Sequence, residues 1–335
     1  MLDATLRALA SLRSRDAQPL SQGLSLENAS ACLHQAIRPL NETSLRSALT
    51  IAEPLPSSIG IVVPYGVFTT PIEWVALALA GGASVHLKAP ERDPAMVRAM
   101  VDAFSSEGLP VGFSTSRSLP PVDAIVAFGD DETVQAIRED NQQIPLSGYG
   151  HRFSVAFSAG DPGQAARSLA LDVARYDSRG CMAPTAVFTT GDPHALCEQL
   201  ATEMATCEAR WPRGSVDPAL GPEWRRRVGL ARVTGRVWTG AKWAVTCSPA
   251  EYFSPTTLPR MIEVHPIENV HSFELFFHPW QRWLSTCGTD LPGHQPAGFH
   301  RVCALGWMQS PPFPRNHDGR PMLSGLHGPT GGADA

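Results

Sequence analysis

Short apolar runs alternate with helix starts between residues 59 and 158, and this alternation limits the fold more than any other feature of the sequence. Residues 59–63, 83–88 and 123–128 have the length and composition of buried strands. Weaker strand patterns follow at residues 111–114 and 152–158. Strands that alternate with helices predict a parallel α/β sheet with right-handed crossovers.

Helix starts mark the segments between these strands. Thr70 and Glu73, with Pro71 at the first helical position, predict a capping box that opens a helix ending at Gly81-Gly82. Asp93-Pro94 predicts a second helix by the same logic, running to about residue 104. Acidic residues 130–132 favour the start of a third helix, which we expect to end near residue 138.

The alternation resumes after residue 161 and predicts a second α/β region. Helices are expected at 164–175 and 193–211, and strands at 185–190, 243–247 and 261–265. We therefore divide the chain into five parts: one or two helices in residues 1–50, a nucleotide-binding domain at 51–160, a catalytic domain at 161–290, a C-terminal segment at 291–327 and a disordered tail at 328–335. The Arg-rich stretch 209–236 is expected to be a solvated, flexible face, and contact with the phosphates of a bound ligand is the alternative.

Composition excludes several classes of protein. A formal net charge of -5 argues against a nucleic-acid binder, which would usually be basic. No window of roughly 18 apolar residues predicts a membrane span. The charged residues Asp3 and Arg7 make this N-terminus unlike a secretory signal. Seven cysteines are too few for a disulfide framework, so we expect reduced thiols in a cytoplasmic protein.

Searches for common catalytic and metal-binding motifs fail. The sequence has no P-loop, no CxxC or HExxH and no nucleophile elbow. GYGHRF at residues 148–153 begins like a dinucleotide fingerprint but lacks the third glycine. His300 and Cys303 form an isolated pair, which we interpret as structural, and we expect no metal site.

Cys181 stands in a distinctive local context. A helix ends before it, Gly180 turns the chain, and a strand bounded by Pro184 follows. A thiol in such a loop lies near backbone N–H groups, which can lower its pKa and stabilise an oxyanion on an attached acyl carbon. The alternative interpretation is a buried structural cysteine.

Sequence blocks from residue 59 to residue 330 resemble the acyl-CoA reductase family of bacterial bioluminescence operons, a branch of the aldehyde dehydrogenase superfamily. The blocks occur in the family's order: VVPYGVFTTP from residue 62, VDAIVAFGDDETVQAI at 122–137, GYGHRFSVAF at 148–157, ALDVARYDSRGCMAP at 170–184, LSTCG at 284–288 and RVCALGWMQSPPFPRNHDGRPMLSGL at 301–326.

This resemblance implies an aldehyde-dehydrogenase-like fold, with a Rossmann-like cofactor domain, an α/β catalytic domain and the cofactor between them. It also implies that Cys181 attacks the thioester of a fatty acyl-CoA, or of an acyl-protein donor, to form an acyl-enzyme. NADPH would then reduce the acyl group to a long-chain aldehyde. A homo-oligomer or acyl-transfer partner subunits are further expectations.

The resemblance assigns other site residues one by one. Pro64 and Gly66 fall in the first nucleotide-binding turn, Lys88 falls where the superfamily contacts the adenosine ribose, and Gly129 falls at the pyrophosphate turn. His151 occupies the block in which aldehyde dehydrogenases place their general base, and histidine can move a proton near neutral pH. A plain turn or a hydrogen-bonded loop residue is the alternative at each position.

Two departures from the family pattern keep rival functions open. Val67 stands where the family has an asparagine that holds the reacting oxygen, and Asp130 stands where it has a small hydroxyl residue. The rivals are a degenerate relative that binds acyl-CoA, nucleotide or a partner without turnover, and a dehydrogenase of another activated carboxylate such as an acyl phosphate. The resemblance gives no role to His317 and Asp318, which we interpret as structural.

Overall fold

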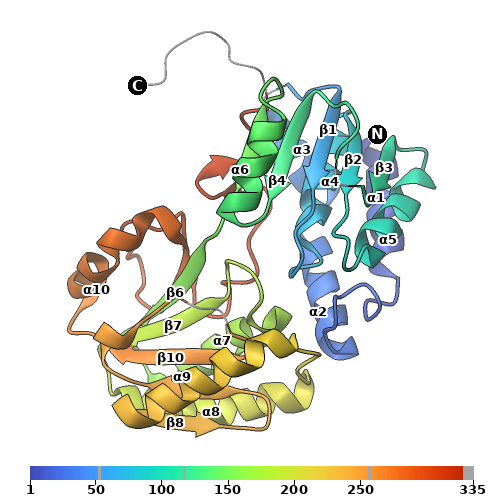
Figure 1. Ribbon diagram of the computed structural model, residues 1–335. Coiled ribbons are helices and arrows are strands. Elements are labelled where there is room, and N and C mark those ends of the chain that lie inside the picture. The colour runs from blue at the N-terminus through green and yellow to red at the C-terminus, as the bar shows by residue number, and fades with distance from the viewer. Residues whose placement is uncertain (52–53, 117, 256–257, 327–335) are drawn as a thin grey trace. The chain divides into compact units, whose positions relative to one another are not determined.

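The chain divides into two compact units. The computed structural model describes residues 1–51, 54–116, 118–255 and 258–326. The first unit contains residues 1–22 and 30–151 and the chain from residue 312 onward, and the second contains residues 23–29 and 152–311. Figure 1 shows both as α/β structures. The predicted tail at 328–335 lies outside the described residues.

The N-terminal region forms three helices, one more than the sequence predicts. They are α1 (Leu2–Arg13), α2 (Leu26–Ile37) and α3 (Glu42–Ile51). The break before α3 has a local cause, because Pro39 precedes an Asn41 side chain that accepts the backbone N–H of Ser44 at 3.0 Å. Asn41 thus starts a third helix in a region where the sequence predicts only one or two.

A five-stranded parallel sheet forms the centre of the first unit. Its strands are β1 (Ser58–Val62), β2 (Ser84–Lys88), β3 (Val111–Ser114), β4 (Ala124–Phe128) and β5 (Leu146–Tyr149), in the spatial order β3-β2-β1-β4-β5. The crossovers contain α4 (Thr70–Ala80), α5 (Ala95–Ser105) and α6 (Asp131–Asp140). The predicted alternation is confirmed, and β5 is a strand that the sequence patterns did not indicate.

The start of α4 differs from the prediction. Its N-cap is Thr69, whose side chain makes no capping hydrogen bond, so the predicted capping box is wrong. The Glu73 carboxylate instead pairs with Arg315, which lies 242 residues further along the chain. The helix ends at Gly81-Gly82 as predicted, and Gly82 adopts a φ of +95° that favours glycine.

A seven-stranded sheet forms the core of the second unit. Its strands are β6 (Phe153–Ser158), β7 (Pro184–Thr189), β8 (Arg236–Thr239), β9 (Ala244–Cys247), β10 (Met261–Pro266), β11 (Leu284–Thr289) and β12 (Arg301–Ala304), in the order β12-β11-β6-β7-β10-β9-β8. Only the β8–β9 pair of this sheet is antiparallel. Its helices are α7 (Pro162–Ala174), α8 (Pro193–Arg210), α9 (Gly221–Thr234) and α10 (Val270–Phe277). Strands β6, β7 and β11 are buried along their whole length, as expected for central strands covered on both faces.

The Arg-rich stretch is only partly the solvated face that we predicted. Much of it is the helix α9, on which Arg225 and Arg226 are exposed. Arg227 is buried, and its guanidinium donates to Glu223 and Glu263 at 3.0 Å each. Paired carboxylates make the burial of this one arginine possible.

The unit boundaries differ from the predicted domain limits. The structure assigns β6 to the second unit, whereas the prediction carried the nucleotide-binding domain through residue 160. Residues from 312 onward return to the first unit and form a short hairpin of β13 (Asn316–His317) and β14 (Arg320–Pro321). Because this return depends on contacts with residues far away in sequence, local patterns contain no signal for it.

Candidate active site

The predicted cofactor residues gather at one edge of the first sheet. Pro64 and Gly66 follow β1, Lys88 ends β2 and Gly129 follows β4, and these three strands are neighbours in the sheet. The chain leaves β1 towards β2, while β4 lies on the other side of β1. This is a topological switch point at the carboxyl ends of parallel strands, where open α/β sheets bind nucleotides.

The turn after β1 is shaped for a glycine. Gly66 has a φ of +129°, and a Cβ built on it would meet no atom within 4 Å. Its N–H donates to Oε1 of Gln22 at 2.7 Å. Gln22 is buried and itself has a φ of +56°. The glycine is therefore required by the backbone conformation rather than by crowding, and Gln22 is a supporting residue that the sequence patterns did not reveal.

Cationic side chains lie near the same edge. Lys88 is half-buried and pairs in register with Val62 on one side and Ser114 on the other. After β2, the Arg92 guanidinium lies 5.0 Å from the centre of the Tyr65 ring. Two cationic residues, Lys88 and Arg92, therefore come at or just after the carboxyl end of β2, and positive charge there would favour an anionic ligand.

The turn after β4 is less suited to phosphate. The Asp130 carboxylate caps α6 by accepting the N–H of Thr133 at 2.7 Å. A hydrogen bond from the Thr133 side chain, followed by this backbone bond, lowers the pKa of Asp130. A Cβ on Gly129 would lie 3.0 Å from Cγ2 of Thr133, so a larger residue there would crowd the first turn of α6. Asp130 therefore occupies the helix N-terminus with negative charge.

His151 ends the first unit with its side chain exposed. Its backbone N–H donates to Oδ1 of Asp131 at 2.9 Å. A Cβ on the preceding Gly150 would lie 2.0 Å from the same oxygen, which explains the glycine at this position. The polypeptide at His151 is therefore fixed by Asp131, while its imidazole faces solvent.

Cys181 lies in the second unit, between a turn of 3-10 helix (Arg175–Ser178) and β7. Its side chain is half-buried. Its carbonyl oxygen accepts a hydrogen bond of 2.6 Å from the hydroxyl of Ser154, at the start of β6. Gly180, with a φ of +84°, turns the chain into this position. The loop is therefore ordered, and the thiol stands partly open at the amino end of β7.

The seven cysteines differ in their exposure to solvent. All seven lie in the described part of the chain, and only Cys181 and Cys303 are half-buried. Burial raises the pKa of Cys303 to about 11 and that of Cys287 well above its ordinary value. Thiols with raised pKa values supply little thiolate at neutral pH.

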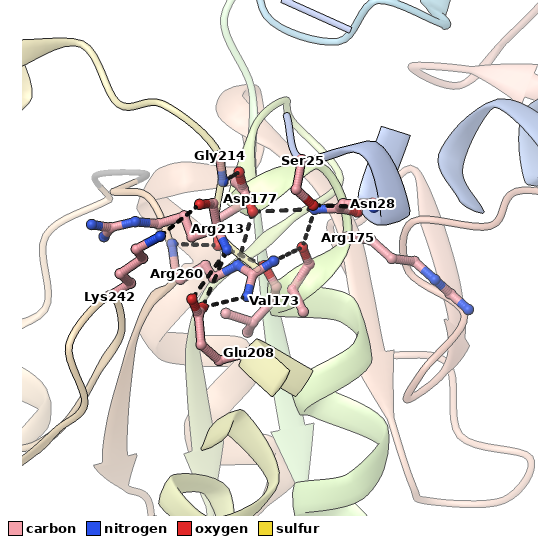
Figure 2. A network of polar contacts seen from close by, with 12 residues as sticks. Ser25, Asn28, Val173, Arg175, Asp177, Glu208, Arg213, Gly214, Lys242 and Arg260 are labelled. Atoms are coloured by element: carbon pink, nitrogen blue, oxygen red, sulfur yellow. Dashed lines mark hydrogen bonds and ion pairs between the residues drawn. The ribbon is translucent and has the colours of Figure 1, made fainter. Parts of the chain in front are cut away.

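A buried polar network surrounds Asp177, in the turn that precedes Cys181 in the chain (Figure 2). Oδ1 of Asp177 accepts from Nε of Arg260 at 2.8 Å and from the Asn28 amide at 3.1 Å. Arg260 also donates to Glu208 at 2.8 Å, and Gly214 donates its N–H to Oδ2 of Asp177 at 3.0 Å. The sequence analysis missed this network, because its members come from four separate segments.

The described residues contain no group of three or more His, Cys, Asp or Glu side chains that could hold a metal ion. Within the same residues, every helix is too short or too polar to cross a bilayer.

Residues 116–327 match the family described as acyl-CoA reductase (LuxC). This span covers more than half of the chain and includes Gly129, His151 and Cys181. The chain belongs to this acyl-CoA reductase family. Pro64, Gly66 and Lys88 precede the matched span, so their assignment depends on the geometry of the sheet edge. Comparison with curated proteins by sequence gives no significant match.

Solved structures of low sequence identity show the same fold as this acyl-CoA reductase family member. An oxidoreductase from Marinobacter aquaeolei aligns with a TM-score of 0.78 at 14% identity, over 94% of this chain and 78% of its own. Indole-3-acetaldehyde dehydrogenase AldA of P. syringae, solved with NAD+, aligns with a TM-score of 0.73 at 12% identity, over 91% and 76%. A Thermus 1-pyrroline-5-carboxylate dehydrogenase with bound NAD gives 0.72 at 15%, over 97% and 78%. The predicted aldehyde-dehydrogenase-like fold is confirmed, and with the family it identifies an oxidoreductase of aldehyde chemistry.

The LGWMQ part of this family member's C-terminal block has a structural role. The buried Asp172 carboxylate accepts the N–H groups of Gly306 at 2.6 Å and Met308 at 3.0 Å. The Gln309 amide donates to the carbonyl oxygens of Asp172 and Arg175 at 2.8 Å each. Burial raises the pKa of Asp172 to about 7. These bonds attach the segment to α7.

His317, in the HDG block, is also packed against neighbouring side chains. Its buried ring packs edge-on against Tyr149 at 4.7 Å and Trp74 at 5.6 Å between centroids. Its Nδ1 lies 2.8 Å from Nη1 of Arg315. Asp318, next to it, has a φ of +48° at the turn of the β13–β14 hairpin. The interpretation of both residues as structural agrees with this packing.

Proposed function

We propose that this protein reduces long-chain fatty acyl-CoA to fatty aldehyde, with NADPH as reductant and an acyl thioester on Cys181 as the intermediate. The observation that carries the proposal is the Cys181 loop. It lies within the family match, its thiol is half-buried, and its backbone is fixed by Ser154.

The chemistry suits a cysteine. The Cys181 thiolate attacks the thioester carbonyl, the C–S bond to CoA breaks, and CoA leaves as a thiolate that takes up a proton. Exchange of one thioester for another is nearly isoenergetic, so acyl transfer needs no external energy. His151, with its exposed imidazole, is the residue that we propose to move protons in these steps.

The residues of the first unit fit a dinucleotide. The open turn at Gly66, the cation of Lys88 and the switch point between β1 and β4 provide room, charge and position. The N-terminus of α4 has no capping side chain, whereas Asp130 caps α6. We therefore propose that the pyrophosphate lies nearer α4 than α6. When bound, NADPH supplies the hydride that converts the acyl thioester to aldehyde.

The remaining expectations continue as proposals. An acyl-protein could replace acyl-CoA as donor, and a homo-oligomer or acyl-transfer partner subunits would deliver the acyl group. A cytoplasmic location agrees with the reduced thiol that the reaction needs.

One experiment tests the function directly. The protein is mixed with palmitoyl-CoA, with and without NADPH, and aldehyde and peptide-level acyl adducts are measured by mass spectrometry. We expect an adduct on Cys181 without NADPH and aldehyde with it. Cys181→Ala should abolish both, whereas the control Cys303→Ser should retain them. An adduct on another residue, or a Cys181→Ala variant with parental activity, would reject the proposed nucleophile.

A second candidate is a degenerate relative that binds acyl-CoA, nucleotide or a partner subunit without turnover. Val67 supplies no side-chain donor for the reacting oxygen, and the Asp130 carboxylate occupies the turn after β4. Removal of one such donor typically slows an enzyme by roughly 100- to 1,000-fold. Saturable NADPH binding with neither adduct nor aldehyde would favour this candidate. An acyl phosphate, included beside palmitoyl-CoA, tests the other rival substrate.

A further inference from the structure

The hydroxyl of Ser154, on β6, connects this strand with β11 and with the Cys181 loop that precedes β7. It donates to the Cys181 carbonyl at 2.6 Å and accepts the N–H of Thr286, on β11, at 3.0 Å. Ser154 has no exposed surface. Because both the donor and the acceptor function of one buried hydroxyl are used, its orientation is fixed.

The other end of the loop is held separately. Tyr176, Asp177 and Ser178 all have left-handed backbone angles, with φ between 53° and 60°. The buried Arg260 supports this turn, since its Nε donates to Asp177 and its backbone N–H donates to Ser178 Oγ at 3.2 Å (Figure 2). Only two residues separate Ser178 from Cys181, so the loop has little freedom between its two fixed ends.

The bond from Ser154 also orients the peptide group that joins Cys181 to Met182. This peptide is trans. A trans peptide carries its C=O and N–H on opposite sides, so the Met182 N–H points away from Ser154. Because this peptide directly follows the thiol-bearing residue, its orientation limits where the Met182 N–H can point, and a backbone N–H directed at a thiol or an acyl oxygen stabilises a thiolate or an oxyanion.

We infer that Ser154 is a positioning residue for the nucleophile Cys181, acting through the peptide group that follows the thiol. This inference rests on the proposed function for its meaning in catalysis. Its direct consequence, a more reactive Cys181 thiol, does not depend on which substrate is reduced.

The test measures thiol reactivity. Iodoacetamide labelling of Cys181 is followed by peptide mass spectrometry across a pH series, with the half-buried Cys303 as internal reference. The decisive pair is Ser154→Thr and Ser154→Val, since these side chains are nearly equal in size and differ in the hydroxyl. We expect Ser154→Thr to label like the parent, and Ser154→Val and Ser154→Ala to label about tenfold more slowly at neutral pH, which corresponds to a thiol pKa raised by about one unit.

Ser158→Ala is the matched control. Ser158 lies on the same strand, is equally buried and donates to Oδ2 of Asp290 at 2.6 Å. It should lower the melting temperature without changing Cys181 labelling. Equal labelling profiles for the Thr and Val variants would overturn the inference, as would a slowing by Ser158→Ala as large as that by Ser154→Ala.

Measuring acyl transfer to Cys181 distinguishes a failure of this inference from a failure of the proposed function. For a positioning role, Ser154→Val should lower kcat for palmitoyl-CoA with little change in KM, and Ser154→Thr should restore it. If the parent forms no acyl adduct, the proposed function fails, while the labelling comparison still decides the role of Ser154.

Discussion

Nε of Arg260 donates to Oδ1 of Asp177 over 2.8 Å, and neither side chain has more than 1% of its surface exposed. A charge this deeply buried is tolerable only with its partner in place. The pair supports the left-handed turn before Cys181, so the stability of the second unit and the geometry of its candidate nucleophile depend on the same contact.

Asp177→Ala should therefore destabilise the protein strongly. Removing one partner of a buried ion pair typically costs about 3–5 kcal/mol, and chemical denaturation will measure the change. Glu42→Ala is the control, because Glu42 pairs with Arg46 on an exposed surface, where about 0.5 kcal/mol is expected. Similar losses for the two variants would contradict the importance of the buried pair.

Asp172 should make stability depend on pH. Its pKa is about 7 in the folded chain, above the ordinary value of 3.8, because burial disfavours the carboxylate. The folded state thus binds the proton more tightly. The stabilisation from this group is complete below about pH 4 and is lost as the pH rises through 7.

Asp172→Asn removes this titration and provides the comparison. The free energy of unfolding of the parent should exceed that of the variant by more at about pH 5 than at about pH 8. Denaturation at both pH values measures the difference, and an advantage that does not change with pH would contradict the prediction.

Asp130→Ser should strengthen NADPH binding. Serine retains the helix cap and removes a negative charge near the proposed phosphate site. We expect the Kd to fall about threefold or more, by fluorescence titration. Glu139→Gln, near the other end of α6, is the control. An equal fall in Kd for both substitutions would show that the change in net charge, and not the position of Asp130, strengthens NADPH binding.

Val67→Asn should accelerate acylation of Cys181. Asparagine would supply the side-chain donor that the family resemblance implies at this position, and one such donor is typically worth roughly 100- to 1,000-fold in rate. Rapid-quench measurement of the acyl adduct checks the change. Val67→Leu, similar in size to asparagine, should give no acceleration. Equal rates for the Asn and Leu variants would show that the donor does not reach the reacting oxygen.

The strand–helix alternation and the Cys181 loop could be predicted because their signals are local. A short apolar run such as residues 59–63 and a turn such as Gly180 act over a few neighbouring residues. The gathering of Gly66, Lys88 and Gly129 at one sheet edge followed from the same alternation.

The missed features depend on distant partners. Glu73 fits a capping box by sequence, but Arg315 competes for its carboxylate from 242 residues away. Ser154 was part of a recognised block, yet its bond to Cys181 depends on the pairing of β6 with β7. Local patterns cannot show which of two possible partners a polar side chain takes.

The return of the chain to the first unit after residue 312 affects how the protein is made. Translation proceeds from the N-terminus, so residues 152–311 have already been synthesised when Arg315 and His317 emerge from the ribosome. The unit proposed to hold the nucleotide is therefore begun first and completed last. A polypeptide that stalls before residue 312 contains the whole nucleophile loop, but it leaves Trp74 and Glu73 without their C-terminal partners.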